Sequence, residues 1–219
     1  KQTKNVTSIN GTFRDQDFGH FLQKTQLSSD LVDTGAELQF SLNWPGAPYQ
    51  ISRATLSGSV NTQLTNGRIL GVDPGLGRIL GALDIWKLGK RLQFDFSDIT
   101  EEGLSFSDIN STLALNQGLL STDKLHINAM PAEIHIKGTT HLATKKIDLQ
   151  ATVLPKFPIA GTMIGNVANK VTKTFIGDEH AGGLLLSLLY EIKGSWEDFT
   201  VNRQFNLGLL PKNTALQKP

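Results

Sequence analysis

Many stretches of this sequence alternate an apolar residue with a polar one, and this period of two constrains the fold more than any other feature. In residues 38–44, leucine, phenylalanine and tryptophan alternate with glutamine, serine and asparagine. The pattern returns at residues 92–97, 125–129, 132–136 and 147–153. Successive side chains of a β-strand point to opposite faces, so each stretch has one apolar side and one polar side. The sequence therefore predicts a mainly β protein whose strands build a sheet with one continuous apolar face.

Turn signals separate the alternating stretches. In the middle of the chain they recur at about the 8–12-residue spacing that is typical of antiparallel strands. Asn66-Gly67 lies between two such stretches, and this dipeptide favours the tight turn of a hairpin. We therefore expect a hairpin there that joins a strand over residues 54–64 to one over residues 68–72.

Two stretches break the alternation with the period of a helix. The first covers about residues 74–88, where Asp73 suits the N-cap and Pro74 the first helical position. The second covers about residues 157–176, where apolar residues recur every four positions. We expect these amphipathic helices to cap the sheet.

Three segments are expected along the chain. Residues 1–35 contain a strand-like stretch and then a short amphipathic helix around Phe18 to Gln26, which we interpret as a lead-in. Residues 36–205 are expected to form the main β domain. Residues 206–219 are predicted to be a disordered tail.

The composition excludes several classes of protein. A formal net charge of +1 without any block of like charge argues against a nucleic-acid binder, which needs a concentrated basic face. The chain has no cysteine, so it has neither disulfides nor thiol nucleophiles. No stretch reaches the roughly 18 apolar residues of a transmembrane helix. We expect the chain to be a mature or excised segment, with any membrane anchor in sequence beyond it.

No group of residues predicts an active site. No serine lies in a nucleophile-elbow pattern, so we expect a protein that is not an enzyme and needs no cofactor. His126 and His135 fall on the polar side of neighbouring strands, with Glu133 nearby, and could face each other across the pair. Such a pair could bind a metal, but zinc sites usually recruit three or four ligands. The favoured interpretation is two ordinary surface histidines and no metal.

Residues 72–99, VDPGLGRILGALDIWKLGKRLQFDFSDI, resemble a signature of the AsmA-like family. This signature, a glycine-rich helix followed by basic residues and a strand, belongs to the C-terminal region of family members of the YhdP type. LNWPGAP at residues 42–48, NGRIL at residues 66–70 and KGSWED at residues 193–198 follow the same family's order. The resemblance covers about residues 36–203.

The resemblance implies a location, a fold and a role. It implies a Gram-negative envelope protein in the periplasm, anchored in the inner membrane by a helix outside this sequence. The implied fold is a curved, antiparallel, open and taco-like sheet that forms an apolar groove. The implied role is phospholipid transport between the inner and outer membranes, with acyl chains sheltered in the groove. The alternative is a non-catalytic structural or interaction domain of the envelope with a closed β core.

The expected partners are phospholipid acyl chains, a membrane surface on the outer-membrane side, and an envelope protein. At the end of the groove or against the membrane we expect the helix residues Ile159, Met163, Val167, Val171 and Phe175, with Lys170 and Lys173 suited to anionic head groups. The groove itself is expected to be lined by the apolar members of the alternating strands, which are Leu38, Phe40, Leu42, Leu56, Val60, Leu92, Phe94, Phe96, Leu113, Leu115, Leu125, Ile127, Ile134, Ile136, Ile147, Leu149 and Val153.

Overall fold

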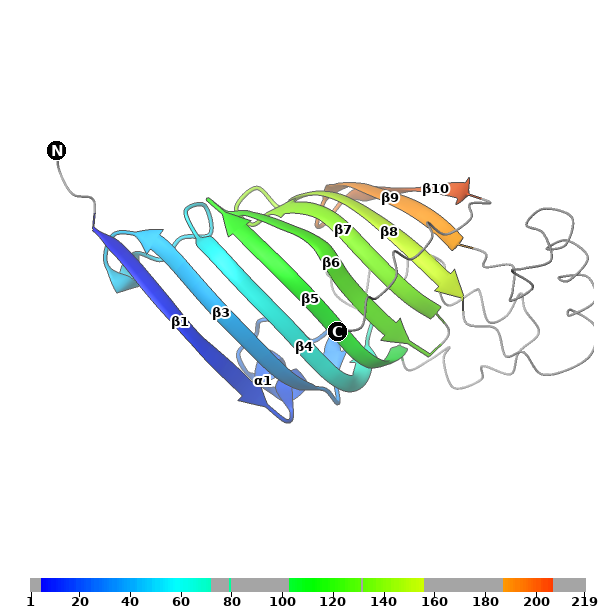
Figure 1. The fold of residues 1–219 in the computed structure, drawn as a ribbon, viewed down its shortest axis with the longest axis horizontal. Helices are drawn as coiled ribbons and strands as arrows, with labels where there is room; N and C mark the ends of the chain where they lie inside the picture. Colours follow the sequence, from blue (N-terminus) through cyan, green and yellow to red (C-terminus); the bar gives the residue numbers. More distant parts are fainter. Residues whose placement is uncertain (1–4, 72–78, 80–102, 131, 156–186, 207–219) are drawn as a thin grey trace, which may run out of the picture.

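One antiparallel β-sheet makes up most of the part of the chain that the structure, a computed structural model, describes (Figure 1). The described residues are 5–71, 79, 103–130, 132–155 and 187–206. The sheet order is β1-β3-β4-β5-β6-β7-β8-β9-β10, and the short β2 pairs with β4 beside this path. The strands are β1 (Val6–Asp15), β2 (Leu31–Val32), β3 (Gly35–Pro45), β4 (Ser57–Ile69), β5 (Leu104–Asn116), β6 (Leu119–Ala129), β7 (Ala132–His141), β8 (Lys146–Pro155), β9 (Ser187–Ser195) and β10 (Phe199–Asn206).

The sheet is open among the described residues. β1 and β10 are its outermost strands and do not pair with each other, and Figure 1 shows the strands side by side in one curved layer. The prediction of a mainly β, open antiparallel sheet is confirmed, and the closed β core of the alternative is not found in the described part of the chain.

The predicted hairpin at Asn66-Gly67 is wrong. β4 runs through both residues without reversing, and its register with β5 is the same on either side of them. Asn66 has φ 50° and Gly67 has φ 144°, so the dipeptide takes unusual backbone angles inside a strand. A Cβ at Gly67 would lie 2.7 Å from the Cβ of Thr34 and 2.9 Å from Cζ of Phe106, so only glycine lets these neighbours pack so closely.

The segment expected to be a lead-in belongs to the sheet. β1 pairs with β3 along its whole length, from Val6 opposite Pro45 to Asp15 opposite Ala36. The predicted short helix is present as α1 (Phe18–Lys24), whose N-cap Asp17 accepts a hydrogen bond from the backbone N–H of His20. A single 3₁₀ turn, η1 (Pro48–Gln50), follows β3.

Most of the other expected elements are observed, and some lie outside the described residues. The predicted turn at Gln117-Gly118 joins β5 to β6. The predicted turn at Met130-Pro131 falls between β6 and β7, with Pro131 outside the described residues. The helix expected over residues 74–88 is outside the described part except for Ile79. The helix expected over residues 157–176 is entirely outside it, as are residues 207–219 of the predicted tail.

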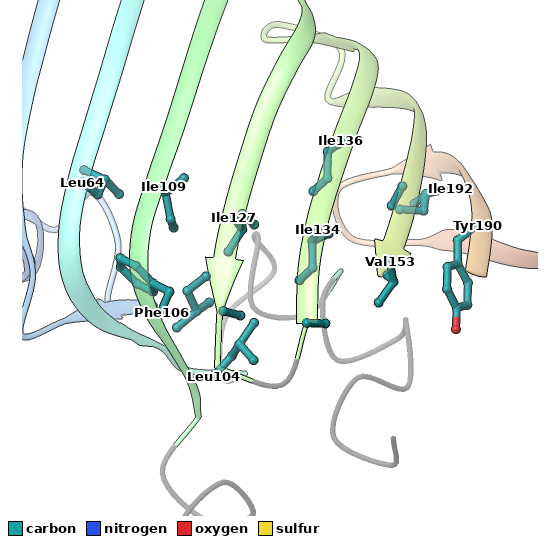
Figure 2. Close-up of a cluster of buried hydrophobic side chains, with 14 of the residues drawn as sticks. Leu64, Leu104, Phe106, Ile109, Ile127, Ile134, Ile136, Val153, Tyr190 and Ile192 are labelled. Atoms are coloured by element: carbon teal, nitrogen blue, oxygen red, sulfur yellow. The ribbon is translucent and has the colours of Figure 1, made fainter. Parts of the chain in front are cut away.

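The hydrophobic core lies on one face of the sheet. Figure 2 shows side chains from successive strands gathered on this face, among them Leu64, Ile109, Ile127 and Ile134. α1 covers the same face near β1 and β3, where Phe18 and Phe21 stack at 5.9 Å between ring centroids.

Candidate functional site

The register of the sheet places the alternating apolar residues in rows across one face, called here the apolar face. Phe40, Val60 and Leu113 are direct partners across β3, β4 and β5. Farther along the sheet, Leu125 lies opposite Ile136 on β6 and β7. Partners in register point to the same side of a sheet, so the face is continuous from strand to strand.

Part of this face is fully buried. Ile127, Ile134, Val153 and Ile192 are each 0% exposed, and Ile136 is 3% exposed. These five residues, called here the buried cluster, belong to the hydrophobic core. Side chains so completely buried hold the fold together and have no surface left for a ligand.

Another part of the same face is only half-buried. Phe40, Leu42, Val60 and Leu113 are neither buried nor fully exposed, and none of them belongs to the hydrophobic core or packs against it. These four residues are called here the half-buried patch. The ring of Phe40 lies over Gly11 of the edge strand, where an added Cβ would be 3.2 Å from its Cζ. The patch is therefore apolar surface that the described core does not use.

The other expected groove residues fall into three groups. Leu115 and Ile147 are buried, Leu38, Leu125 and Leu149 are half-buried against the core, and Leu56 is half-buried in the residue before β4. Outside the described residues lie the groove residues Leu92, Phe94 and Phe96 and the helix residues Ile159, Met163, Val167, Lys170, Val171, Lys173 and Phe175.

Several buried core residues were not predicted from the sequence. Leu64, Ile109, Tyr190 and Ile192 are all buried on the apolar face. Ile109 lies opposite Leu64 on one side and Ile127 on the other. The residues two positions away on either side of Ile109 are the serines Ser107 and Ser111, so the local sequence shows no apolar row there. Its cross-strand pairing identifies Ile109 as core.

The opposite face of the sheet is polar and is itself hollowed. A depression of about 580 Å³ is lined by side chains from β3 to β7, among them Glu37, Gln39, Asn110 and His126. Arg14 donates a hydrogen bond of 2.8 Å to Glu37, and this bond holds the pKa of the Glu37 carboxyl below its usual value. Charge and hydrogen-bonding groups thus gather on the face that the alternation leaves polar.

The predicted pairing of the two histidines is confirmed on this polar face. His126 lies directly opposite His135, and their rings stack at 4.5 Å between centroids. Burial is the main cause that lowers the pKa of His135, the positive charge of His126 adds to it, and the Glu133 carboxylate opposes both. The two imidazoles therefore form one electrostatic unit with Glu133.

None of the helices that the structure describes is long and apolar enough to cross a membrane. α1 has seven residues and packs its apolar side on the sheet.

These features define a class of protein in which one open β-sheet carries both the structural core and spare apolar surface. A family model described as "YhdP protein" matches residues 1–201 of the 219, so the chain belongs to the YhdP family. This confirms the resemblance and extends it to the first strand. The chain is 28% identical over 203 residues to the "Intermembrane phospholipid transporter YhdP" of Escherichia coli (strain K12). That alignment covers 90% of this chain and 16% of the E. coli protein. No solved structure matches the chain.

Proposed function

We propose that this chain shelters the acyl chains of phospholipids during their transport between the inner and outer membranes of a Gram-negative envelope. The observation that carries the proposal is the half-buried patch, an apolar surface on an open sheet that lies apart from the hydrophobic core. The E. coli relative is described as an intermembrane phospholipid transporter, and this supports the same chemistry.

The physical argument rests on hydrophobic burial. Each methylene group that leaves water for an apolar surface gains about 0.8 kcal/mol, so a fatty tail needs no specific polar pocket. Transport also requires that the lipid leaves again, which favours weak and repeated contacts. The half-buried patch offers such repeated apolar contacts on adjacent strands, at Phe40, Val60 and Leu113.

The location and partners belong to the same proposal. The chain is proposed to work in the periplasm as part of a longer protein, held in the inner membrane by a segment beyond this sequence. A membrane surface on the outer-membrane side and an envelope protein are its proposed partners. The segment 157–176, with Lys170 and Lys173, is proposed to contact anionic head groups at the end of the apolar face.

Photocrosslinking with a matched pair of positions tests the proposal. A photoreactive residue is placed at Leu113, on the apolar face, or at the preceding residue Thr112, which points to the polar face. We expect lipid adducts by mass spectrometry at position 113 and few or none at position 112. Equal adducts at both positions, or no lipid in an organic extract of the gently purified protein, would contradict the proposal.

A second pair of variants separates binding from folding. Leu113→Asp places a charge on the half-buried patch, and Thr112→Asp places the same charge on the polar face. We expect Leu113→Asp to lose most of its copurified lipid while it keeps its circular dichroism spectrum, and Thr112→Asp to keep the lipid. If a folded Leu113→Asp protein retains all its lipid, the patch does not bind acyl chains.

A further inference from the structure

Three side chains with metal-binding atoms converge on the polar face, between β6 and β7. His126 and His135 are register partners, and Glu133 precedes His135 by two residues, which puts it on the same face. The Oε2 atom of Glu133 lies 3.8 Å from Nε2 of His126. One ligand atom from each of the three residues falls within 4.8 Å of the others.

One of these atoms is unsatisfied. Nε2 of His126 is buried and has no hydrogen-bond partner among the residues that the structure describes. Its distance of 3.8 Å to Glu133 is too long for a hydrogen bond. A buried polar atom without a partner is costly and needs an explanation, such as an ion that the atom coordinates.

We propose that His126, His135 and Glu133 bind one divalent transition-metal ion, of which zinc fits best. Two imidazole nitrogens and one carboxylate are the ligand types of zinc sites with an open position, which water completes. Zinc takes nitrogen at about 2.0–2.1 Å and carboxylate oxygen at about 2.0–2.2 Å. Magnesium and calcium prefer all-oxygen shells and suit this set poorly.

The geometry is close to what such an ion requires. Ligand atoms about 2.1 Å from a tetrahedral centre lie roughly 3.4 Å apart. The ligand atoms, which now lie within 4.8 Å of one another, therefore have to move closer together, and we expect rotation about the side-chain bonds to achieve this. His135 is more exposed than His126 and Glu133, which leaves one side of the site open to water.

The neighbouring charges set the expected strength of binding. Asp108 lies on β5 and is held by hydrogen bonds of 2.8 Å from Asn110 and Asn128, so it is not counted as a ligand. Lys124 lies two residues before His126 on β6, and Lys137 lies two residues after His135 on β7. Both side chains weaken the attraction for a cation. The affinity must therefore come from the coordination bonds themselves.

An ion at this position would also stabilise the pairing of β6 with β7. The ladder between β6 and β7 has a register shift between Thr122 and Leu125, immediately before His126. A bond from each strand to one ion crosses the pair beside this irregularity. Because the ion binds the folded chain, it raises the temperature of unfolding.

The test uses the untagged protein and zinc chloride, with magnesium chloride as the ion control. Isothermal titration calorimetry is expected to show one zinc ion per chain and no magnesium. Loss of an outer-shell partner typically costs about 10–100-fold in metal affinity, and loss of a direct ligand should cost at least as much. We therefore expect His135→Ala and His126→Ala, which remove a ligand atom, to lose about tenfold or more in zinc affinity. Glu133→Gln should lose less, because the glutamine keeps a side-chain oxygen that can still coordinate the ion.

The matched control is His20→Ala, which removes an exposed histidine on α1, far from the site in the fold. Zinc should raise the unfolding temperature of the wild type and of His20→Ala, and should not raise that of His135→Ala. His135 is exposed, so its variant is expected to fold, and circular dichroism checks this. No zinc binding by the wild type, or equal binding by a folded His135→Ala protein, would overturn the proposal. Neither result bears on lipid binding.

Discussion

The buried cluster and the half-buried patch arise from the same sequence pattern, yet they are different surfaces. Ile127 and Leu113 both follow the alternation and both point to the apolar face, but Ile127 is fully buried and Leu113 is not. Ile127 packs among core side chains from neighbouring strands, whereas Leu113 has no place in that core. An apolar face is therefore divided by tertiary packing into a part that holds the fold and a part that is available for a ligand.

The difference matters for function because burial and binding compete for the same side chains. A residue that is 0% exposed already has the apolar contacts that an acyl chain would provide. A half-buried residue gains further free energy when an acyl chain covers it, at roughly 25 cal/mol for each Å² removed from water. The half-buried patch is a described surface on the apolar face where this gain is still available.

The largest expected effect comes from truncating a leucine in each region. Leu64 is 5% exposed and belongs to the hydrophobic core, and Leu113 lies in the half-buried patch on the next strand. Leu64→Ala should lower the free energy of unfolding by about 2–5 kcal/mol, because it leaves a cavity. Leu113→Ala should cost roughly half of that or less, since the site is partly open to water. Urea unfolding measures both.

A contrary result would be informative. If the two substitutions cost the same, Leu113 is part of the core and the two regions are one. The comparison requires lipid-free protein, because bound lipid would stabilise the folded wild type and enlarge the apparent cost of Leu113→Ala.

A smaller effect on the free energy of unfolding is expected from a glycine in β7, whose backbone conformation does not suit a larger residue. Gly138 in β7 has φ 130°, and a Cβ there would lie 2.3 Å from the carbonyl oxygen of Asp148. Gly138→Ala should therefore lower the free energy of unfolding by about 1–3 kcal/mol. Gly71→Ala is the control, because a Cβ at Gly71 meets no described atom within 4 Å; we expect it to stay within about 0.5 kcal/mol of wild type. Thermal unfolding that does not separate the two variants would contradict this explanation.

The sequence predicted the strands and their two faces because alternation is a local property that burial on one face enforces. It predicted the facing histidines for the same reason, since a short turn fixes the register of β6 and β7. The local signal failed at Asn66-Gly67, where the dipeptide adopts unusual backbone angles without reversing the chain. Pairing with β2, β3 and β5 carries β4 through that point, and no local pattern records such long-range contacts.

The candidate site was predictable only in part. The alternation placed Phe40, Val60 and Leu113 on the apolar face, and the register confirms that placement. Which apolar residues are buried depends on α1 and on strands far along the chain. The sequence therefore identifies the face, and only the packed structure separates the half-buried patch from the buried cluster.

The smallest expected effect concerns His135 on the polar face, opposite both the buried cluster and the half-buried patch. Burial, and secondarily the charge of His126, lower the pKa of His135 from its ordinary value of 6.5. In metal-free protein, the NMR titration of His135 should have its midpoint below 6.5, and His126→Ala should move that midpoint upward.

The lowered pKa of His135 also makes the stability of the fold depend on pH. In the unfolded chain, His135 takes up a proton at higher pH than it does in the folded chain. Folded stability from this group is therefore intact above pH 6.5 and falls as the pH drops from 6.5 toward the lowered pKa. A midpoint at or above 6.5 would mean that water reaches His135 freely and that the stacked pair is not maintained in solution.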